Sequence, residues 1–508
     1  MTRDAGEAAH GGRVPILELQ GVTKRFPGVL AVDGVDLAVA RGEVHVVAGE
    51  NGAGKSTLMK LLSQVERPDA GRVLIDGKPV PFHGPRHAQS LGVAMVYQEF
   101  ALAPDLSVAE NLFLGREPGR GGVVRRAEQS RQARQLLARV GLDVGPERPA
   151  ASLSVANQQL VEIAKALAID ASVVIMDEPT ATLAGQEIDE LFEVIRGLTA
   201  QSIAVLYISH RLDEIFRIAD RVTVMRDGRV VATSQVSELD EGKLVTQMVG
   251  REIVDLYPKP DLKPGDVILR VNGITRRKVL SDCSFAVRER EILGFAGLVG
   301  SGRTELARAV FGADPIDSGK VELDGRDVTA SSPQEAIGTG IGYLSEDRKR
   351  DGLALQLGID QNITLAHLPM SAGRLDLKAE RKIAERRCDQ LRIRTPSVRR
   401  QVNVLSGGNQ QKVVAAKWLE TEARVLFFDE PARGIDVGAK AELFELIGEL
   451  AAAGHCIVLI SSYLPELLNL CDRILVMRDG CVAGVLGREE FSEERVIGLA
   501  TGAGGAGA

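Results

Sequence analysis

Residues 49–56 have the sequence Gly49-Glu50-Asn51-Gly52-Ala53-Gly54-Lys55-Ser56. This spacing matches the phosphate-loop pattern G-x-x-x-x-G-K-[ST], in which backbone N–H groups at a helix start face phosphate, the Lys reaches the β- and γ-phosphates, and the hydroxyl ligates Mg²⁺. The context fits, because an apolar strand-like run precedes the loop at 43–48 and a helical pattern follows it at 57–62. We therefore expect the run from Gly49 to Thr57 to bind the phosphates of a nucleotide.

A second loop of this kind differs from the first at the most important residue. It reads Gly297-Leu298-Val299-Gly300-Ser301-Gly302-Arg303-Thr304, and Arg replaces the Lys of the pattern. A strand-like run and a helical pattern flank it as well. Arg is a larger planar cation that holds phosphate but does not substitute for the compact ammonium of Lys. We expect the second loop to bind nucleotide with Gly297, Gly300, Gly302, Arg303 and Thr304, but less effectively than the first.

Composition limits the possible classes of protein. The chain has 508 residues with 44% apolar and 26% charged residues, as in ordinary globular proteins. Its net charge of −7 argues against broad binding of nucleic acid. No apolar stretch approaches the roughly 18 to 20 residues that span a bilayer, and residues 1–14 lack the apolar core of a signal peptide, so we expect a cytoplasmic location. The five cysteines show no C-x-x-C spacing, which favours neither disulfides nor zinc.

The chain is a tandem repeat. Besides the two loops, Met176-Asp177-Glu178-Pro179 recurs as Phe428-Asp429-Glu430-Pro431, and Leu153-Ser154 recurs as Leu405-Ser406. Strand-like runs alternate with helical patterns in each copy, which predicts an α/β layer with a mainly parallel sheet. We expect a first domain at 14–250, a linker at 251–265, where three prolines prevent a helix, and a second domain at 266–500. We expect disordered tails at 1–13 and 501–508.

Adjacent carboxylates end two apolar, strand-like runs, at Asp177-Glu178 and at Asp429-Glu430. Carboxylates at such a place are costly unless a cation or a proton transfer needs them. We expect the Asp to join the shell of Mg²⁺, and the following Glu to orient the attacking water or accept its proton.

These residues resemble the ATP-binding cassette (ABC) ATPases over nearly the whole chain. The finer resemblance is to the fused double-cassette subunits of bacterial monosaccharide importers of the ribose, xylose, arabinose and galactose type. It is carried by residues 346–353 (Glu-Asp-Arg-Lys-Arg-Asp-Gly-Leu), 405–412 (Leu-Ser-Gly-Gly-Asn-Gln-Gln-Lys), 416–419 (Ala-Lys-Trp-Leu) and 433–440 (Arg-Gly-Ile-Asp-Val-Gly-Ala-Lys). The resemblance implies two P-loop ATPase domains, each with a mainly parallel sheet core, an antiparallel β subdomain and a helical subdomain.

The resemblance also implies which residues form the first ATP site. In the family, each ATP lies between the phosphate loop of one cassette and the Leu-Ser-Gly-Gly helix start of the other. The expected catalytic residues are Lys55, Gln98, Glu178 and His210, and the expected Mg²⁺ ligands are Ser56, Gln98 and Asp177. Ser406, Gly407 and Gly408 of the second copy would complete this site. Phe26 would stack on adenine, because an aromatic ring supplies the flat apolar face that a base needs.

The second ATP site shows several departures from the family pattern. It would combine Arg303, Thr304, Glu346, Asp429, Glu430 and Tyr463 with Ser154, Val155 and Ala156 of the first copy. Glu346 replaces the usual Gln, and Tyr463 takes the place of His210. Val155 and Ala156 replace glycines that allow a helix start to approach phosphate closely. In addition, Ala184 stands where the second copy has Asp436, the interface Asp of the family. We expect one competent site and one degenerate site.

Three functions remain open at this stage. The first is an ATP-hydrolysing subunit that energises import of a monosaccharide or related small solute. It would bind a membrane permease, in two copies, at the cytoplasmic face of the membrane, through a helical subdomain at 100–150, and would depend indirectly on an extracytoplasmic solute-binding protein. The second is a nucleoside or autoinducer importer. The third is a soluble tandem cassette protein acting on ribosomes or nucleic acid, which the acidic net charge disfavours.

Overall fold

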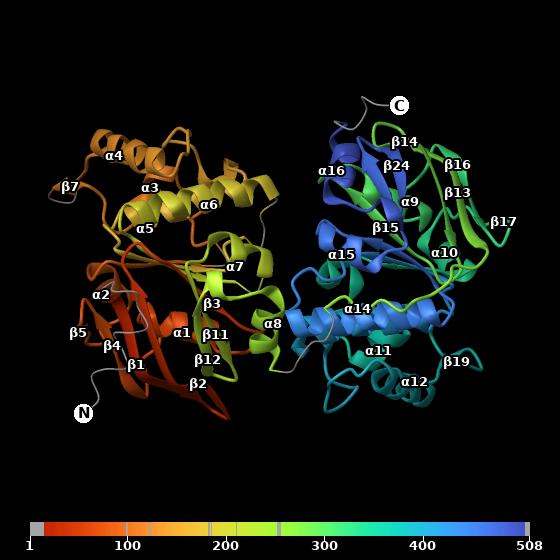
Figure 1. The fold of residues 1–508 in the computed structure, drawn as a ribbon, viewed down its shortest axis with the longest axis horizontal. Helices are drawn as coiled ribbons and strands as arrows, with labels where there is room; N and C mark the ends of the chain where they lie inside the picture. Colours follow the sequence, from red (N-terminus) through yellow and green to blue (C-terminus); the bar gives the residue numbers. More distant parts are fainter. Residues whose placement is uncertain are drawn as a thin grey trace. The chain divides into compact units, whose positions relative to one another are not determined.

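The computed structural model of the chain describes residues 15–97, 100–120, 123–180, 183, 185–209, 211–250 and 256–502. The chain divides into two compact units, Met1–Ile253 and Val254–Ala508. Each unit contains an antiparallel sheet, a larger sheet of mainly parallel strands, and helices (Figure 1). The expected fold class is therefore confirmed. None of the helices in the described ranges is long and apolar enough to cross a membrane.

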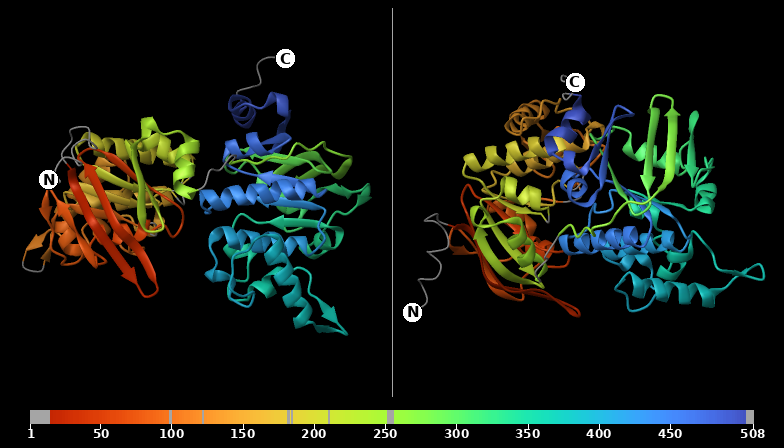
Figure 2. Two further views of the ribbon diagram at one scale, coloured as in Figure 1. Left: turned by 60° about the horizontal axis from the view of Figure 1, so that its bottom comes forward. Right: turned by 45° about the vertical axis from the view of Figure 1, so that its right-hand side comes forward.

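The antiparallel sheet of the first unit has the strand order β2-β1-β4-β5. Its two long strands form a twisted hairpin, drawn in red in Figure 2. Inward-facing valines and leucines of this hairpin are buried, whereas its far end, from Phe26 to Leu30, is exposed. The strands are β1 (Pro15–Phe26), β2 (Val29–Ala40), β4 (Ala70–Ile75) and β5 (Lys78–Pro79).

The larger sheet of the first unit has the order β12-β11-β3-β10-β9-β6, and only β12 runs antiparallel to its neighbour. Every residue of β3 and β10 is buried, as expected of central strands covered on both faces. The register places Ile208 beside both Val47 and Asp177, so the ends of three strands meet at one edge. The strands are β3 (Val44–Ala48), β6 (Val93–Val96), β9 (Val173–Asp177), β10 (Ala204–Ile208), β11 (Arg221–Arg226) and β12 (Arg229–Gln235).

The helices of the first unit include a separate layer formed by α3, α4 and α5, which contact one another (Figure 1). A two-stranded ribbon, β7 (Gly119–Arg120) with β8 (Val123–Val124), precedes α4. The helices are α1 (Lys55–Leu62), α2 (Pro85–Ser90), α3 (Val108–Leu112), α4 (Arg126–Arg139), α5 (Val155–Leu167), α6 (Gly185–Ala200), α7 (Leu212–Ile218) and α8 (Glu241–Val249).

The second unit repeats this topology. Its sheets have the orders β14-β13-β16-β17 and β18-β21-β22-β15-β23-β24, and β24 is again the only antiparallel strand of the larger sheet. The strands are β13 (Val267–Arg276), β14 (Leu280–Arg288), β15 (Ile292–Gly297), β16 (Ser318–Leu323), β17 (Arg326–Asp327), β18 (Ile341–Leu344), β21 (Val425–Asp429), β22 (Cys456–Ile460), β23 (Arg473–Arg478) and β24 (Cys481–Gly487).

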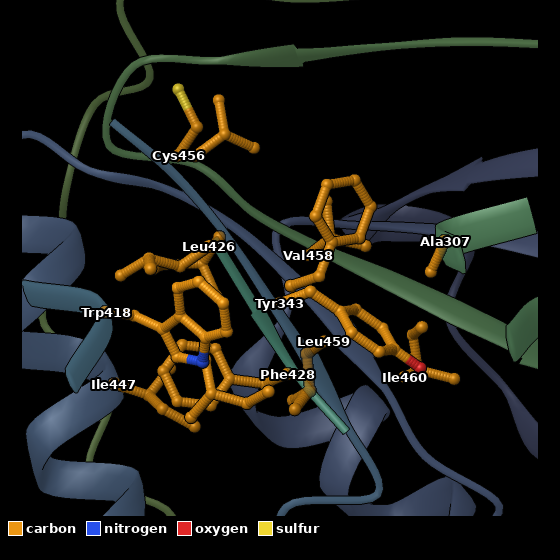
Figure 3. Close-up of a cluster of buried hydrophobic side chains, with 14 of the residues drawn as sticks. Ala307, Tyr343, Trp418, Leu426, Phe428, Ile447, Cys456, Val458, Leu459 and Ile460 are labelled. Atoms are coloured by element: carbon orange, nitrogen blue, oxygen red, sulfur yellow. The ribbon is translucent and has the colours of Figure 1, made fainter. Parts of the chain in front are cut away.

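The helices α11, α12 and α13 form the corresponding layer of the second unit, with the ribbon β19 (Met370–Ser371) and β20 (Arg374–Leu375) before α12. The helices are α9 (Arg303–Val310), α10 (Pro333–Thr339), α11 (Ile359–Thr364), α12 (Leu377–Gln390), α13 (Gly407–Leu419), α14 (Val437–Ala452), α15 (Leu464–Leu470) and α16 (Glu493–Thr501). Aromatic side chains join this layer to the sheet, because Phe311 contacts both Tyr343 and Trp418 with ring centroids 5.5 Å apart. Figure 3 shows Trp418 packed with Leu426 and other residues of the central strands.

The segment that precedes β13 lies along α14. Tyr257 stacks on Phe444 with ring centroids 5.6 Å apart. A Cβ on Gly448 would lie 2.8 Å from Cδ of Pro260, so only glycine allows this approach. Lys259 forms an ion pair of 2.6 Å with Asp472. Residues 257–260 are therefore bound to the second unit.

Candidate functional sites

The first phosphate loop joins the end of β3 to the start of α1. Gly49 and Gly54 have φ of 155° and 99°, a conformation that side chains rarely adopt. Added Cβ atoms would lie 2.3 Å from the carbonyl oxygens of Met225 and Ala31, respectively. Both glycines are therefore required by the backbone path itself, and no side chain caps the start of the helix that follows.

Lys55 lies within this loop. Its side chain is buried, and its Nζ donates to the carbonyl oxygens of Gly49 at 2.7 Å and of Glu50 at 2.9 Å. The ammonium is thus held by the loop itself, and its expected contact with the β- and γ-phosphates stays a prediction. Ser56 follows at the second position of α1.

The second phosphate loop joins β15 to α9 with a similar backbone. Gly297 and Gly302 have φ of 152° and 102°, and a Cβ on Gly297 would lie 2.5 Å from the carbonyl oxygen of Met477. Arg303 is buried as well, but its Nη1 donates to the carbonyl oxygen of Ser461 at 2.8 Å. Ser461 follows β22, so the cation of this loop is bonded to the end of the neighbouring strand.

Asp177 and Glu178 lie where β9 ends. Burial raises the pKa of Asp177, the nearby charge of Glu178 adds to this effect, and Lys55 and Lys60 oppose it. Glu178 has φ of 44°, and its N–H donates to the carbonyl oxygen of Ile208 at 3.2 Å. A non-glycine residue in this region is strained, and such strain occurs often at functional sites.

The second unit repeats this arrangement more deeply buried. Asp429 is fully buried and accepts a hydrogen bond of 2.7 Å from the hydroxyl of Tyr343. Glu430 has φ of 45°, and its N–H donates to the carbonyl oxygen of Ile460 at 2.9 Å. Burial raises the pKa of Glu430 to about 7, although Arg303 and a hydrogen bond from Ser462 lower it. The two copies thus share the geometry of the acidic pair.

A buried carboxylate that the sequence analysis missed organises the loop after β10. Glu214 is fully buried and accepts hydrogen bonds from Thr180 at 2.6 Å, Tyr207 at 2.9 Å and Ser209 at 2.8 Å. Arg211 forms an ion pair with it at 3.1 Å. Glu214 therefore links the segment after Glu178 to both neighbours of position 210.

The corresponding carboxylate of the second unit has a different partner. Glu466 accepts a hydrogen bond of 2.7 Å from Ser461 and forms an ion pair of 2.7 Å with Lys440 of α14. The Nζ of Lys440 also lies 4.6 Å from the ring centroid of Tyr463. Tyr463 directly precedes α15 and donates its N–H to Ser461, just as Arg211 precedes α7 and donates its N–H to Ser209. The structure therefore matches Tyr463 with Arg211, and the expected match with His210 is wrong.

The helix starts at 154 and 406 differ in their first residues. Ser154 caps α5 by accepting from the N–H of Asn157, and Val155 is exposed. In the second unit a Cβ on Gly408 would lie 2.4 Å from Cβ of Ala439, so packing against α14 also requires this glycine. Asp436 caps α14 through the N–H of Ala439 at 2.8 Å.

Phe26 ends β1 with 37% of its surface exposed, and the Nζ of Lys24 lies 5.3 Å from its ring centroid. The ring is therefore partly exposed, with the Lys24 ammonium over it. Three expected residues, Gln98, Ala184 and His210, lie outside the described residues. The expected role of Ser406, Gly407 and Gly408 toward the first loop stays a prediction.

Comparison with known proteins agrees with this geometry. A model of the ABC transporter family matches residues 32–181 and 280–433, which contain the two phosphate loops and the two acidic pairs. The chain therefore belongs to the ABC transporter family. It is an ATP-binding protein with two cassettes, an ATPase of the ABC type.

The similarity to individual proteins extends over the full length of the chain. Ribose import ATP-binding protein RbsA 3 of Rubrobacter xylanophilus is 74% identical over 96% of this chain and 99% of its own length. The putative ribose/galactose/methyl galactoside import ATP-binding protein 1 of Agrobacterium fabrum is 49% identical over 98% of this chain and 99% of its own length. Ribose import ATP-binding protein RbsA 2 of Streptomyces avermitilis is 50% identical over 97% of this chain and 98% of its own length.

Proposed function

We propose that this chain hydrolyses ATP to energise the import of ribose, or of a closely related monosaccharide, through a membrane permease. The observation that carries the proposal is the 74% identity, over nearly the whole of both chains, to a protein named as a ribose import ATP-binding protein. The working partner is an integral-membrane permease, present in two copies, which receives solute from an extracytoplasmic binding protein. Binding to this permease holds the chain at the cytoplasmic face of the membrane.

In this proposal, hydrolysis at the first site depends on the phosphate loop, the carboxylate after β9 and the aromatic ring at the end of β1. Lys55 stabilises the negative charge that develops on the phosphates, and the N–H groups of the loop do the same. Glu178, at the end of β9, orients the attacking water and accepts its proton. Phe26 stacks on the adenine ring.

The first site also fits Mg²⁺. Ser56 offers a hydroxyl and Asp177 a carboxylate, and such hard oxygen ligands are those that Mg²⁺ prefers. Burial makes the negative form of Asp177 costly, and a nearby cation would offset that cost. We assign Ser56, Asp177 and Gln98 as its protein ligands. A bound Mg²⁺ would supply positive charge that stabilises the phosphates.

We further propose that the second cassette binds nucleotide but hydrolyses it slowly. The supporting observation is that the cations of the two loops have different partners. Lys55 donates to carbonyl oxygens of its own loop, whereas Arg303 donates to the carbonyl oxygen of Ser461 at the end of β22. Single-turnover counting of the phosphate released per chain tests the asymmetry. We expect one phosphate per chain, and two phosphates per chain would contradict the proposal.

Transport is tested by deleting the gene and measuring uptake of labelled ribose, xylose and galactose in cells complemented with the wild type or with Glu178→Gln. Loss of ribose uptake, restored only by the wild type, is expected. Unchanged uptake of all three sugars would contradict the proposal. Affinity purification from detergent-solubilised membranes should recover a polytopic permease, and recovery of ribosomes instead would overturn the assignment.

A further inference from the structure

The segment after β18 has a conformation that the sequence does not predict. Residues Arg348–Gly352 form one π-helical turn, and the chain then continues to α11. The segment is therefore a covalent connection between the larger sheet and the helical layer of the second unit. It lies within residues 346–353. This stretch carries the resemblance to the double-cassette subunits of monosaccharide importers, and the sequence analysis assigns only its first residue, Glu346, to a site.

Arg348 joins this turn to two other parts of the unit. Its Nη1 donates to the carbonyl oxygen of Arg433 at 2.7 Å, and its Nη2 donates to that of Gly434 at 3.1 Å. Its Nε lies 3.4 Å from Oε1 of Gln410, a buried residue in the first turns of α13. One planar guanidinium thus contacts the loop after Glu430 and the helix that begins at Gly407.

The absence of a side chain at Gly407 leaves room for this guanidinium. A Cβ at position 407 would lie 2.7 Å from Nη2 of Arg348 and 3.0 Å from the carbonyl oxygen of Gly434. In the first copy Val155 starts the equivalent helix, and residues 97–103 contain no arginine. The second copy therefore has both Arg348 and a glycine at the helix start, and the first copy has neither the arginine nor the glycine.

Two further contacts fix the same segment. The carboxylate of Glu346 contacts the guanidinium of Arg433, so its charge has a partner on the loop after Glu430. Lys417, in the last turn of α13, donates to the carbonyl oxygen of Gly352 at 2.7 Å. The first copy keeps the equivalent lysine contact, from Lys165 to the carbonyl oxygen of Ala101 at 3.0 Å. Arg348 has no arginine counterpart in residues 97–103 of the first copy. Gln98, which matches Glu346 in the sequence, lies outside the described residues.

We propose that Arg348 is a positioning residue for ATP hydrolysis, which holds the start of α13 and the loop after Glu430 in one arrangement relative to residues 346–352. A movement of the helical layer that displaces residues 346–352 then moves the start of α13 and the loop after Glu430 together. Two bonds from a charged donor to adjacent carbonyls are strong enough for this role, since such bonds are stronger than neutral ones and the fork fixes direction as well as distance. The proposal depends on the ATPase activity and not on the transported solute.

The first test compares Arg348→Ala with Arg350→Ala in the full chain. Arg350 is the matched control, because it lies on the same turn with its side chain 82% exposed. Amide hydrogen exchange of residues 405–411 and 431–437 should become about tenfold faster in Arg348→Ala and stay unchanged in Arg350→Ala. The KM for ATP should rise while kcat falls. A smaller folded fraction would lower kcat and leave KM unchanged, and that result would overturn the proposal.

The second test is a double-mutant cycle with Gly407→Ala. In the wild type the added methyl displaces the guanidinium and also crowds the helix start. In Arg348→Ala only the second effect remains, so the loss of kcat/KM caused by Gly407→Ala should be about tenfold smaller. Equal losses in the two backgrounds would overturn the proposal. If Arg348→Ala does not fold, Arg348→Met, which keeps the aliphatic stem, replaces it in both tests.

Discussion

Arg303 donates from its Nη1 to the carbonyl oxygen of Ser461 across 2.8 Å. The bond joins the second phosphate loop to the end of β22, whereas Lys55 bonds to carbonyls of its own loop. The two loops have nearly the same glycine conformations, with φ of 155° and 152° at the first glycine. A difference of one residue has thus become a difference in where the positive charge lies.

Lys55→Ala should lower kcat for ATP hydrolysis by about 10²-fold or more, because it removes charge stabilisation from the transition state. Arg303→Ala should lower kcat less than about threefold. Steady-state phosphate release measures both. Lys78→Ala is the control, since Lys78 is an exposed cation of the same cassette. Similar losses for Lys55 and Arg303 would contradict two unequal sites.

Glu178→Gln should abolish steady-state hydrolysis, because the amide cannot accept the proton of the attacking water. Glu430→Gln should retain more than about half of the activity, since in our proposal the second cassette contributes little to hydrolysis. Nucleotide binding, measured separately by equilibrium titration, should persist in both variants. Equal loss of hydrolysis in the two would show that both carboxylates are needed.

Phe26→Ala should raise the KM for ATP about five- to tenfold and change kcat less than twofold, because stacking contributes on the order of 1 kcal/mol to binding. Phe26→Tyr should restore the wild-type KM. Val29 pairs with Phe26 across the hairpin and is also exposed, so Val29→Ala is the matched control. If both alanine variants raise KM equally, the hairpin position matters and the aromatic ring does not.

Lys417→Met should make the stability difference from the wild type depend on pH. Burial lowers the pKa of Lys417 from its usual 10.5 to about 8. Between these values the unfolded chain binds the proton and the folded chain does not, so the wild type gains stability as pH rises from 8 to 10.5. Below pH 8 the cost of burying the charge is fully present.

The unfolding free energy of the wild type minus that of Lys417→Met should therefore increase by at most about 3 kcal/mol from pH 7.5 to 10. Urea unfolding at several pH values measures this difference. Lys349→Met is the control, because Lys349 is exposed. A difference that stays constant across this range would mean that Lys417 remains charged when folded.

The phosphate loops, the acidic strand ends and the repeat were all predictable from sequence. Each depends on a short local pattern, a glycine-rich turn between strand and helix or a carboxylate after an apolar run, and such patterns fix their own backbone. The confirmed fold class follows from the same alternation of strands and helices. The composition of the sites beyond these patterns stays a prediction.

Contacts between distant segments could not be predicted from one sequence. The sequence shows only that Glu346 replaces the usual Gln of the family, whereas the structure shows its contact with Arg433, a partner that only the packing of two loops brings near. The hydrogen bonds of Glu214 and the left-handed backbone of Glu178 have the same origin. No local pattern marks them, although a glutamate shortly after Tyr207-Ile208-Ser209 is a weak signal.

The contact of Pro260 with Gly448 has a practical consequence for dividing the protein into halves. A recombinant second cassette that begins at β13 would lack Tyr257 and Lys259, and would leave the ring of Phe444 and the carboxylate of Asp472 facing water. One that begins just before Tyr257 keeps both contacts. The proline-rich peptide between the cassettes thus belongs, in folding terms, to the downstream half, and any split gene should be cut on its upstream side.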